Sequence, residues 1–187
     1  GGETGTGLLN QSTVTVNGGN ITDDACTEIP ANISHSKAVV SGPTAVVGQP
    51  GQFSLTYRIT VQNTGAAAGT YDLADTFGFD PEASIVAGSV SAAVDPATST
   101  VSNALTAGFT GTVAQPQIIA AESINPGQQE SYLVTVVVNV PNTATATAAT
   151  CTAVPSTGNG LFNQASLTVN ATSTTADACV DTPKVAN

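Results

Sequence analysis

The chain has 187 residues, enough for one all-β sandwich around a single core, and its Thr, Val, Ala, Ser, Asn and Gly favour strands joined by small-residue turns. The formal net charge is −10, with three Lys and Arg residues against 13 Asp and Glu, which opposes binding to nucleic acids and to anionic membrane surfaces. No apolar run approaches the roughly 18 residues of a membrane-spanning helix, and because the chain starts with Gly we expect a mature, exported protein.

The first predicted strand is GTGLLNQSTVTVN, residues 5–17, and it recurs near the end of the chain as GNGLFNQASLTVN, residues 158–170. At this spacing of 153 residues, 13 of the 26 positions from residue 5 to residue 30 are identical without a gap. The identities include a Cys and a Pro, which Thr- and Ser-rich composition does not produce by chance. We therefore interpret the two segments as a true duplication.

The leading copy of this strand carries four apolar side chains, Leu8, Leu9, Val14 and Val16. Because the final copy completes the body of the protein, the leading copy is spare. We predict that it docks on a sheet edge outside its own domain, through main-chain hydrogen bonds and alternate apolar side chains that enter a core.

The three cysteines are Cys26, Cys151 and Cys179, and none has the spacing of a metal site. In an exported chain they favour disulfide formation, and an extracellular or cell-surface location follows. The duplication aligns Cys26 with Cys179. We expect a disulfide between Cys151 and Cys179, which leaves Cys26 unpaired or bonded to another subunit.

The body is predicted to begin with a strand over residues 31–40, followed by turn residues up to Gly51. Residues 52–63 alternate apolar and polar side chains, which is typical of a half-buried strand. Residues 130–140 form the longest apolar strand, and we expect it to be central. Further strands are predicted over residues 70–79, 83–94, 104–113, 116–124 and 160–170, the last followed by a tail closed by Cys179.

Short strands without helical periodicity predict an all-β, immunoglobulin-like β-sandwich, with an additional N-terminal strand that pairs outside its own domain. On this interpretation residues 1–31 are an N-terminal extension that duplicates the final strand. Residues 32–187 are the sandwich with its Cys-closed tail.

The segments SKAVVSGPTAVVGQPGQFSLTYRITVQNTGAAAGTYDLADTF, INPGQQESYLVTVVVNV and LFNQASLTV, in this order, resemble the surface-protein repeat called domain of unknown function eleven. The most specific pieces are Asn63-Thr64-Gly65, Asp75-Thr76 and Pro126-Gly127. The resemblance implies an immunoglobulin-like module that occurs in tandem along large bacterial and archaeal surface proteins as a stalk or spacer. The long segment from residue 70 to residue 113 and the Cys-closed tail depart from that family's pattern.

Two structural functions fit the duplicated strand. In the favoured one, the protein is a subunit of an extracellular filament that assembles head to tail with copies of itself through the leading strand. In the alternative, residues 1–31 end a preceding repeat, and the chain is one repeat of a tandem stalk or adhesin. An adhesive function toward a glycan or host surface is a third hypothesis, although no aromatic platform stands out.

Catalytic motifs are absent from the sequence, and the single histidine, His35, is not accompanied by a nucleophile motif, so we expect no enzyme. Lys37 on the first strand of the body and Asn163 on the last, with Asp75 or Glu130 between them, resemble in residue type the groups that form intramolecular amide crosslinks in collagen-adhesin B-type domains. Such a bond needs an unprotonated Lys beside a protonated acid.

Acidic side chains gather between residues 72 and 82, where Asp72, Asp75, Asp80 and Glu82 offer oxygen ligands to calcium. Their spacing matches no calcium-binding loop such as the EF-hand. We therefore expect no metal and no other cofactor.

Overall fold

The computed structural model of the protein describes residues 7–97, 100–141, 150–151 and 157–184. These described residues form eleven β-strands and no helix, which confirms the all-β prediction. The strands are β1 (Leu8–Val16), β2 (Gly19–Thr27), β3 (Ile33–Ala45), β4 (Gln52–Asn63), β5 (Gly69–Phe77), β6 (Ser84–Ile85), β7 (Ser91–Val94), β8 (Gln117–Ile124), β9 (Gln129–Asn139), β10 (Asn163–Val169) and β11 (Thr172–Ala178).

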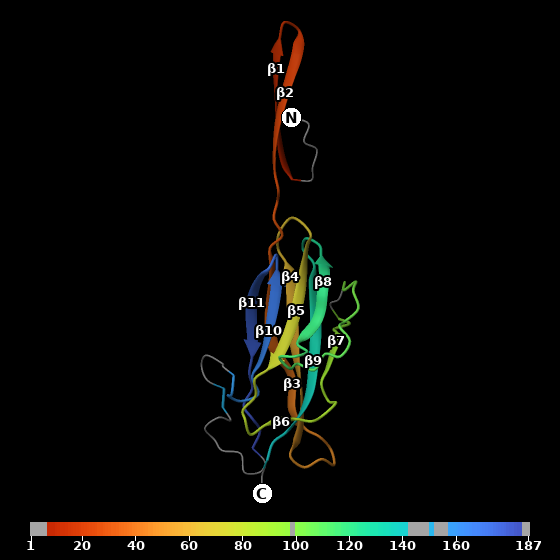
Figure 1. Ribbon diagram of the computed structural model, residues 1–187, viewed down its shortest axis with the longest axis vertical. Helices are drawn as coiled ribbons and strands as arrows, with labels where there is room; N and C mark the ends of the chain where they lie inside the picture. Colours follow the sequence, from red (N-terminus) through yellow and green to blue (C-terminus); the bar gives the residue numbers. More distant parts are fainter. Residues whose placement is uncertain (1–6, 98–99, 142–149, 152–156, 185–187) are drawn as a thin grey trace.

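Strands β3 to β11 make an immunoglobulin-like sandwich of two antiparallel sheets, as the sequence predicts (Figure 1). One sheet has the order β3-β4-β9-β6, with β7 also paired to β9. The other has the order β11-β10-β5-β8. The edge strand β3 lies against β10 and β11 of the opposite sheet, so the first and last parts of the body are neighbours.

The core lies between the sheets and follows the period-2 alternation of their strands. On β4 the inward positions Leu55, Tyr57, Ile59 and Val61 are 0–1% exposed, and their neighbours face outward. β9 supplies four further buried side chains in the same way and pairs with β4 along its length, which places it inside the sheet as predicted. Each fully buried large apolar side chain contributes about 1.5 to 3 kcal/mol, so β4 and β9 together supply a large part of the cohesion of the sandwich.

Three predicted segments differ substantially from the structure, whereas the other predicted strand ends differ by at most three residues. β3 continues to Ala45 through the predicted turn, and its register is irregular around Gly42 (φ 84°). Edge strands tolerate such irregularities because one side of the strand has no pairing partner. Residues 83–94 form two short strands, because Gly88 (φ 73°) begins a new turn between them. Residues 104–113 form a loop with one isolated bridge between Thr112 and Gln115, and its positive-φ Gly111 packs on the ring of Phe77.

β1 and β2 pair with each other in a separate two-stranded sheet, which projects from one end of the sandwich (Figure 1). We call residues 8–27 the free hairpin. The sequence predicted a single docking strand here, and β2 was not predicted because it contains few apolar residues. The turn that makes the pair is Asn17-Gly18, whose φ angles of 50° and 82° suit a type I′ hairpin.

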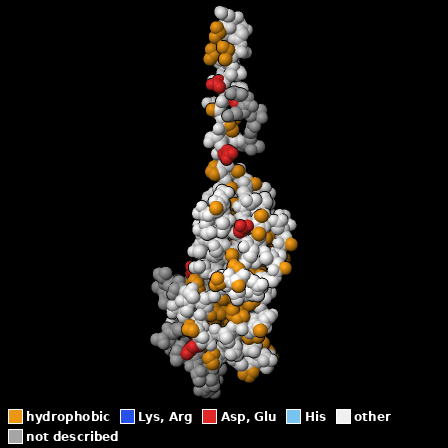
Figure 2. Space-filling model, in the orientation of Figure 1, with side chains coloured by type: hydrophobic (Ala, Val, Ile, Leu, Met, Phe, Trp, Pro, Cys, Tyr) orange, Lys and Arg blue, Asp and Glu red, His pale blue; other side chains and the backbone are white. Residues whose placement is uncertain are grey.

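The apolar side chains of the free hairpin are exposed to solvent (Figure 2). Leu8 is 64% exposed, Val14 59%, Val16 51% and Leu9 45%. Where the hairpin meets the body there is an open cleft of about 770 Å³, lined by residues 28–31, which connect β2 to β3, and by the loop between β4 and β5. These side chains are therefore not part of the core of the sandwich.

Candidate functional site

Lys37, Asp75 and Asn163 come together between the two sheets. Lys37 lies on the edge strand β3 of one sheet, whereas Asp75 on β5 and Asn163 at the start of β10 belong to the other. In the β5–β10 register Asp75 lies opposite Ala165, so Asn163, two residues earlier on β10, is its diagonal neighbour on the inner face. The alternation of the strands thus aims all three side chains into the core.

The Lys37 amine bridges the carboxylate, with Nζ 3.0 Å from Oδ1 and 3.0 Å from Oδ2 of Asp75. Asn163 donates from Nδ2 to the same Oδ2 at 3.1 Å. The side chains of Lys37 and Asp75 are 0% exposed, and Asn163 is also fully buried. Lys37 and Asn163 therefore approach one carboxylate oxygen from opposite sheets, in a site without access to water.

Burial shifts both ionisable groups of this cluster toward their neutral forms. Loss of hydration lowers the pKa of the Lys37 amine and raises the pKa of the Asp75 carboxyl, although the opposite charge of each partner counteracts the shift. Transfer of one proton from the ammonium to the carboxylate gives a neutral amine and a neutral acid. A dry site favours this form because it removes two buried charges at once.

One polar atom of the cluster has no partner. The amide oxygen Oδ1 of Asn163 is buried and accepts no hydrogen bond, which costs free energy in a dry site. A protonated Asp75 carboxyl has a proton to donate to this oxygen once the amide turns over. A neutral, protonated Asp75 would therefore supply the hydrogen bond that the Asn163 amide oxygen lacks.

The aromatic ring of Tyr57 packs against the Lys37 amine, with Nζ 5.2 Å from the ring centroid. The Tyr57 hydroxyl donates to the carbonyl of Leu161 at 2.6 Å and so ties β4 to the segment that leads into β10. His35, two residues before Lys37, places Nε2 3.4 Å from the carbonyl of Ala165. These contacts fix β3 and the start of β10 on either side of the cluster.

The alternative acid, Glu130, has other partners. It lies on β9 and accepts hydrogen bonds from the hydroxyls of Tyr71 and Thr100. Among the described residues the carboxylate that contacts Lys37 is that of Asp75. Of the two acids that the sequence allowed, Asp75 occupies the site.

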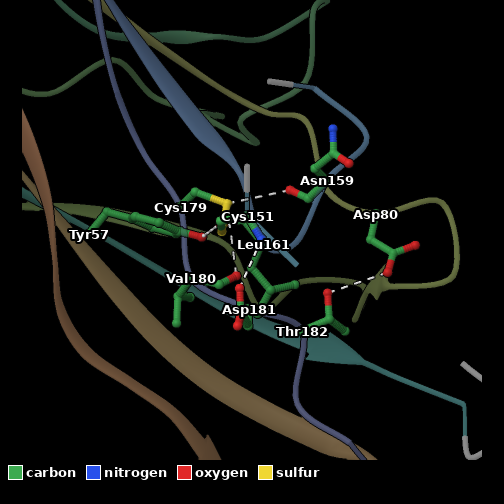
Figure 3. The surroundings of a disulfide bond; sticks show 9 residues. All are labelled: Tyr57, Asp80, Cys151, Asn159, Leu161, Cys179, Val180, Asp181 and Thr182. Atoms are coloured by element: carbon green, nitrogen blue, oxygen red, sulfur yellow. Dashed lines mark hydrogen bonds between the residues drawn. A yellow bond between two sulfur atoms is a disulfide. The ribbon is translucent and has the colours of Figure 1, made fainter. Parts of the chain in front are cut away.

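A disulfide joins Cys151 to Cys179 next to the start of β10, with Cα atoms 5.9 Å apart (Figure 3). Cys26 on the free hairpin is an exposed free thiol. Gly160 (φ 50°) lies directly against the disulfide, since a Cβ there would come within 2.8 Å of the Cys151 sulfur. The Leu161 amide donates to the Val180 carbonyl at 2.7 Å. The disulfide therefore holds the end of β11 against the segment that enters β10.

Removal of this disulfide is expected to destabilise the sandwich. Replacing both Cys151 and Cys179 with Ser frees a loop with a sequence separation of 28, and we expect the free energy of unfolding to fall by about 3 to 4 kcal/mol in denaturant titrations. The matched control is Cys26→Ser, which should leave the titration unchanged. Superimposable curves for the double variant and the control would contradict this assignment.

The acidic side chains considered for calcium have other contacts. Asp72 accepts a hydrogen bond from the Ala121 amide, and Asp80 accepts one from the Glu82 amide. In the part of the chain that the structure describes, no three His, Cys, Asp or Glu side chains gather as a metal site requires, and no helix is long and apolar enough to cross a membrane.

No protein-family model and no curated protein matches the sequence. Among solved structures, the chain is similar to a family 123 glycoside hydrolase from Clostridium perfringens, with 11% identity and a TM-score of 0.40 over 82% of this chain and 28% of that one. The pilus protein RrgB from Streptococcus pneumoniae is 13% identical, with a TM-score of 0.33 over 81% of this chain and 24% of that one. The major pilin subunit BcpA of Bacillus cereus is 13% identical, with a TM-score of 0.31 over 90% and 46%. The chain thus spans less than half the length of each.

Proposed function

We propose that the protein is a load-bearing structural module of an extracellular filament or stalk, closed by an internal amide bond between Lys37 and Asn163. The observation that carries this proposal is the shared contact of both side chains with Oδ2 of the buried Asp75. A buried Lys and Asn on an acid have little value as a binding site, because solutes do not reach them. Their arrangement instead suits a reaction between the two side chains.

The bond forms by attack of the neutral Lys37 amine on Cγ of Asn163. Asp75, having taken the proton from the ammonium, donates a hydrogen bond to the amide oxygen and stabilises the negative charge that develops there. The tetrahedral intermediate then expels the Asn163 nitrogen, which leaves as ammonia with protons returned through Asp75. One C–N bond forms, one C–N bond breaks, and no oxidant or cofactor is needed. The reaction occurs once per molecule, so the role is structural and not that of an enzyme.

The position of the bond explains what it does for the fold. It joins β3 to β10, which belong to different sheets and to opposite ends of the sequence of the body. The free hairpin leaves one end of the sandwich next to the start of β3, and β11 runs from there toward the other end (Figure 1). Tension applied along the long axis passes from β3 through the amide bond into β10. The strands between Lys37 and Asn163 then bear no load.

The setting of this module is extracellular. The disulfide between Cys151 and Cys179 is typical of oxidising compartments. The exposed apolar face of the free hairpin indicates contact with another copy of the same fold, as a head-to-tail filament or a tandem stalk requires.

The intact mass of the purified protein tests the crosslink. We expect it to lie about 17 Da below the sequence mass with the disulfide included, because one ammonia is lost. The Asp75→Ala variant should have the full mass calculated from its own sequence and disulfide, without the loss of ammonia. The matched control is Arg58→Gln, which breaks the 2.8 Å ion pair with Asp95 and should keep the loss of ammonia. A wild-type mass without the deficit would reject the proposed crosslink.

A further inference from the structure

We propose that the free hairpin is the closing hairpin of another copy of this sandwich, placed before it in the same polypeptide, and that Asn10 is the amide acceptor of that copy. The inference rests on the proposed crosslink and extends it to a second site. It is carried by the match between the free hairpin and the β10–β11 hairpin of the body.

The two hairpins have the same strand register. In the free hairpin Asn10 pairs with Ala25 and Val16 with Gly19. In the body, at a spacing of 153 residues, Asn163 pairs with Ala178 and Val169 with Thr172. The duplicated sequence therefore folds into a duplicated structure, pair for pair.

The turns of the two hairpins also match. Asn17 and Gly18 have φ angles of 50° and 82°, and Asn170 and Ala171 have 49° and 62°. Both pairs have the two positive φ angles that a type I′ turn requires. Ala171 adopts this conformation without the freedom of glycine, so the turn geometry is retained in spite of a less favourable residue.

Burial is where the two hairpins differ. Leu161 and Phe162 are 0% and 3% exposed, and Leu167 is 1% exposed. The equivalent side chains of the free hairpin are Leu8, Leu9 and Val14, which are 64%, 45% and 59% exposed. The free hairpin thus keeps the apolar positions of a closing hairpin without the body that would cover them. Its complement is a sandwich that presents a β5 edge and lacks its own final hairpin.

Two residues with specific chemistry occupy equivalent positions. Asn10 corresponds to Asn163, and on a body like this one it would reach the Lys and Asp that stand where Lys37 and Asp75 stand. Cys26 corresponds to Cys179, and it is free and exposed. Gly7 lies against the Cys26 sulfur, with an ideal Cβ only 3.0 Å away, as Gly160 lies against Cys179 at 3.1 Å. The free hairpin therefore retains both the crosslink residue and the disulfide residue.

The same polypeptide is favoured over a second molecule because the receiving site of a second molecule is filled. In this chain β10 already pairs with β5, and the disulfide fixes β11 beside it. A free hairpin from another molecule would have to displace that hairpin. A body that precedes the free hairpin along the chain has no such competitor, and the short linker of residues 28–32 leads from its closing hairpin directly to the next β3.

A tandem polypeptide tests this assignment. Residues 1–157 followed by residues 5–187 place the hairpin sequence after the first body at the natural spacing of 153 residues. We expect loss of two ammonia molecules, about 34 Da, together with two disulfides and one free thiol. Asn10→Ala in the internal copy should reduce the loss to about 17 Da with both disulfides kept. The matched control is the same substitution in the terminal copy, which should leave the loss at about 34 Da.

Each contrary outcome has a distinct meaning. If the natural chain and the tandem polypeptide each lose only one ammonia, the hairpin assignment is overturned while the crosslink at Asn163 stands. Removal of the first body by limited proteolysis has the same meaning, because it shows that the internal hairpin does not complete that body. If neither polypeptide loses ammonia, the crosslink itself is overturned. If the natural chain forms covalent multimers that Asn10→Ala abolishes, the hairpin acts between molecules and its placement in the same polypeptide is wrong.

Discussion

Replacing Asn163 with Ala is expected to lower the free energy of unfolding by about 5 kcal/mol, because a crosslink between residues 37 and 163 closes a loop on the order of 100 residues. The cause is the same as for a long-range disulfide, since the bond restricts the unfolded chain more than the folded one. The variant removes the acceptor and leaves the Lys37 and Asp75 side chains in the site, so the change in the free energy of unfolding reports mainly the loss of the bond. Loss of the buried Asn163 side chain adds a smaller local cost.

Thermal unfolding followed by circular dichroism measures this effect. We expect the Tm of Asn163→Ala to fall by roughly 10 to 20 °C relative to the wild type. Arg58→Gln serves as the control, because its ion pair with Asp95 is partly exposed, and it should change stability by less than about 1 kcal/mol. If the Tm of Asn163→Ala lies within a few degrees of the Tm values of the wild type and of Arg58→Gln, no bond joins residues 37 and 163.

The second large effect is mechanical. When the protein is pulled from its two ends, we expect the sandwich of the wild type to show no unfolding step, because the amide bond and the disulfide carry the tension past the core strands. Only the free hairpin, which lies outside both bonds, should open. In Asn163→Ala about 110 residues between Lys37 and the disulfide are released, and at about 3.4 Å each the chain should lengthen by roughly 350 to 400 Å. The Cys26→Ser protein is the control and should behave as the wild type. A step of the same length in the wild type would contradict the proposed load path.

The parts of the fold that could be predicted are those with strong local periodicity. β4 alternates apolar and polar residues over its whole length, and β9 is the longest apolar run, so both strands and their central places follow from the sequence. β2 was not predicted because most of its residues are polar, although Asn17-Gly18 is a strong hairpin signal. The loop at residues 104–113 was missed because its glycines take positive φ only in the folded context.

The candidate site could be predicted only as a set of residue types. Lys37 and Asn163 lie on the first and last strands of the body, and that much follows from order along the chain. Nothing in the sequence separates Asp75 from Glu130, because both are acids on inward positions of apolar strands. The choice depends on which strand faces β3 across the sandwich. It also depends on the hydroxyls of Tyr71 and Thr100, which bind Glu130.

The most direct test of the account is a tryptic digest of the reduced and denatured protein, followed by mass spectrometry. Trypsin has three sites, after Lys37, Arg58 and Lys184, and it does not cleave after a lysine whose Nζ is in an amide bond. We predict one branched product in which residues 1–58 are joined to residues 59–184, with a mass about 17 Da below the sum of the two peptides. Separate peptides 1–37, 38–58 and 59–184, each at its sequence mass, would contradict the claim that Lys37 and Asn163 are bonded.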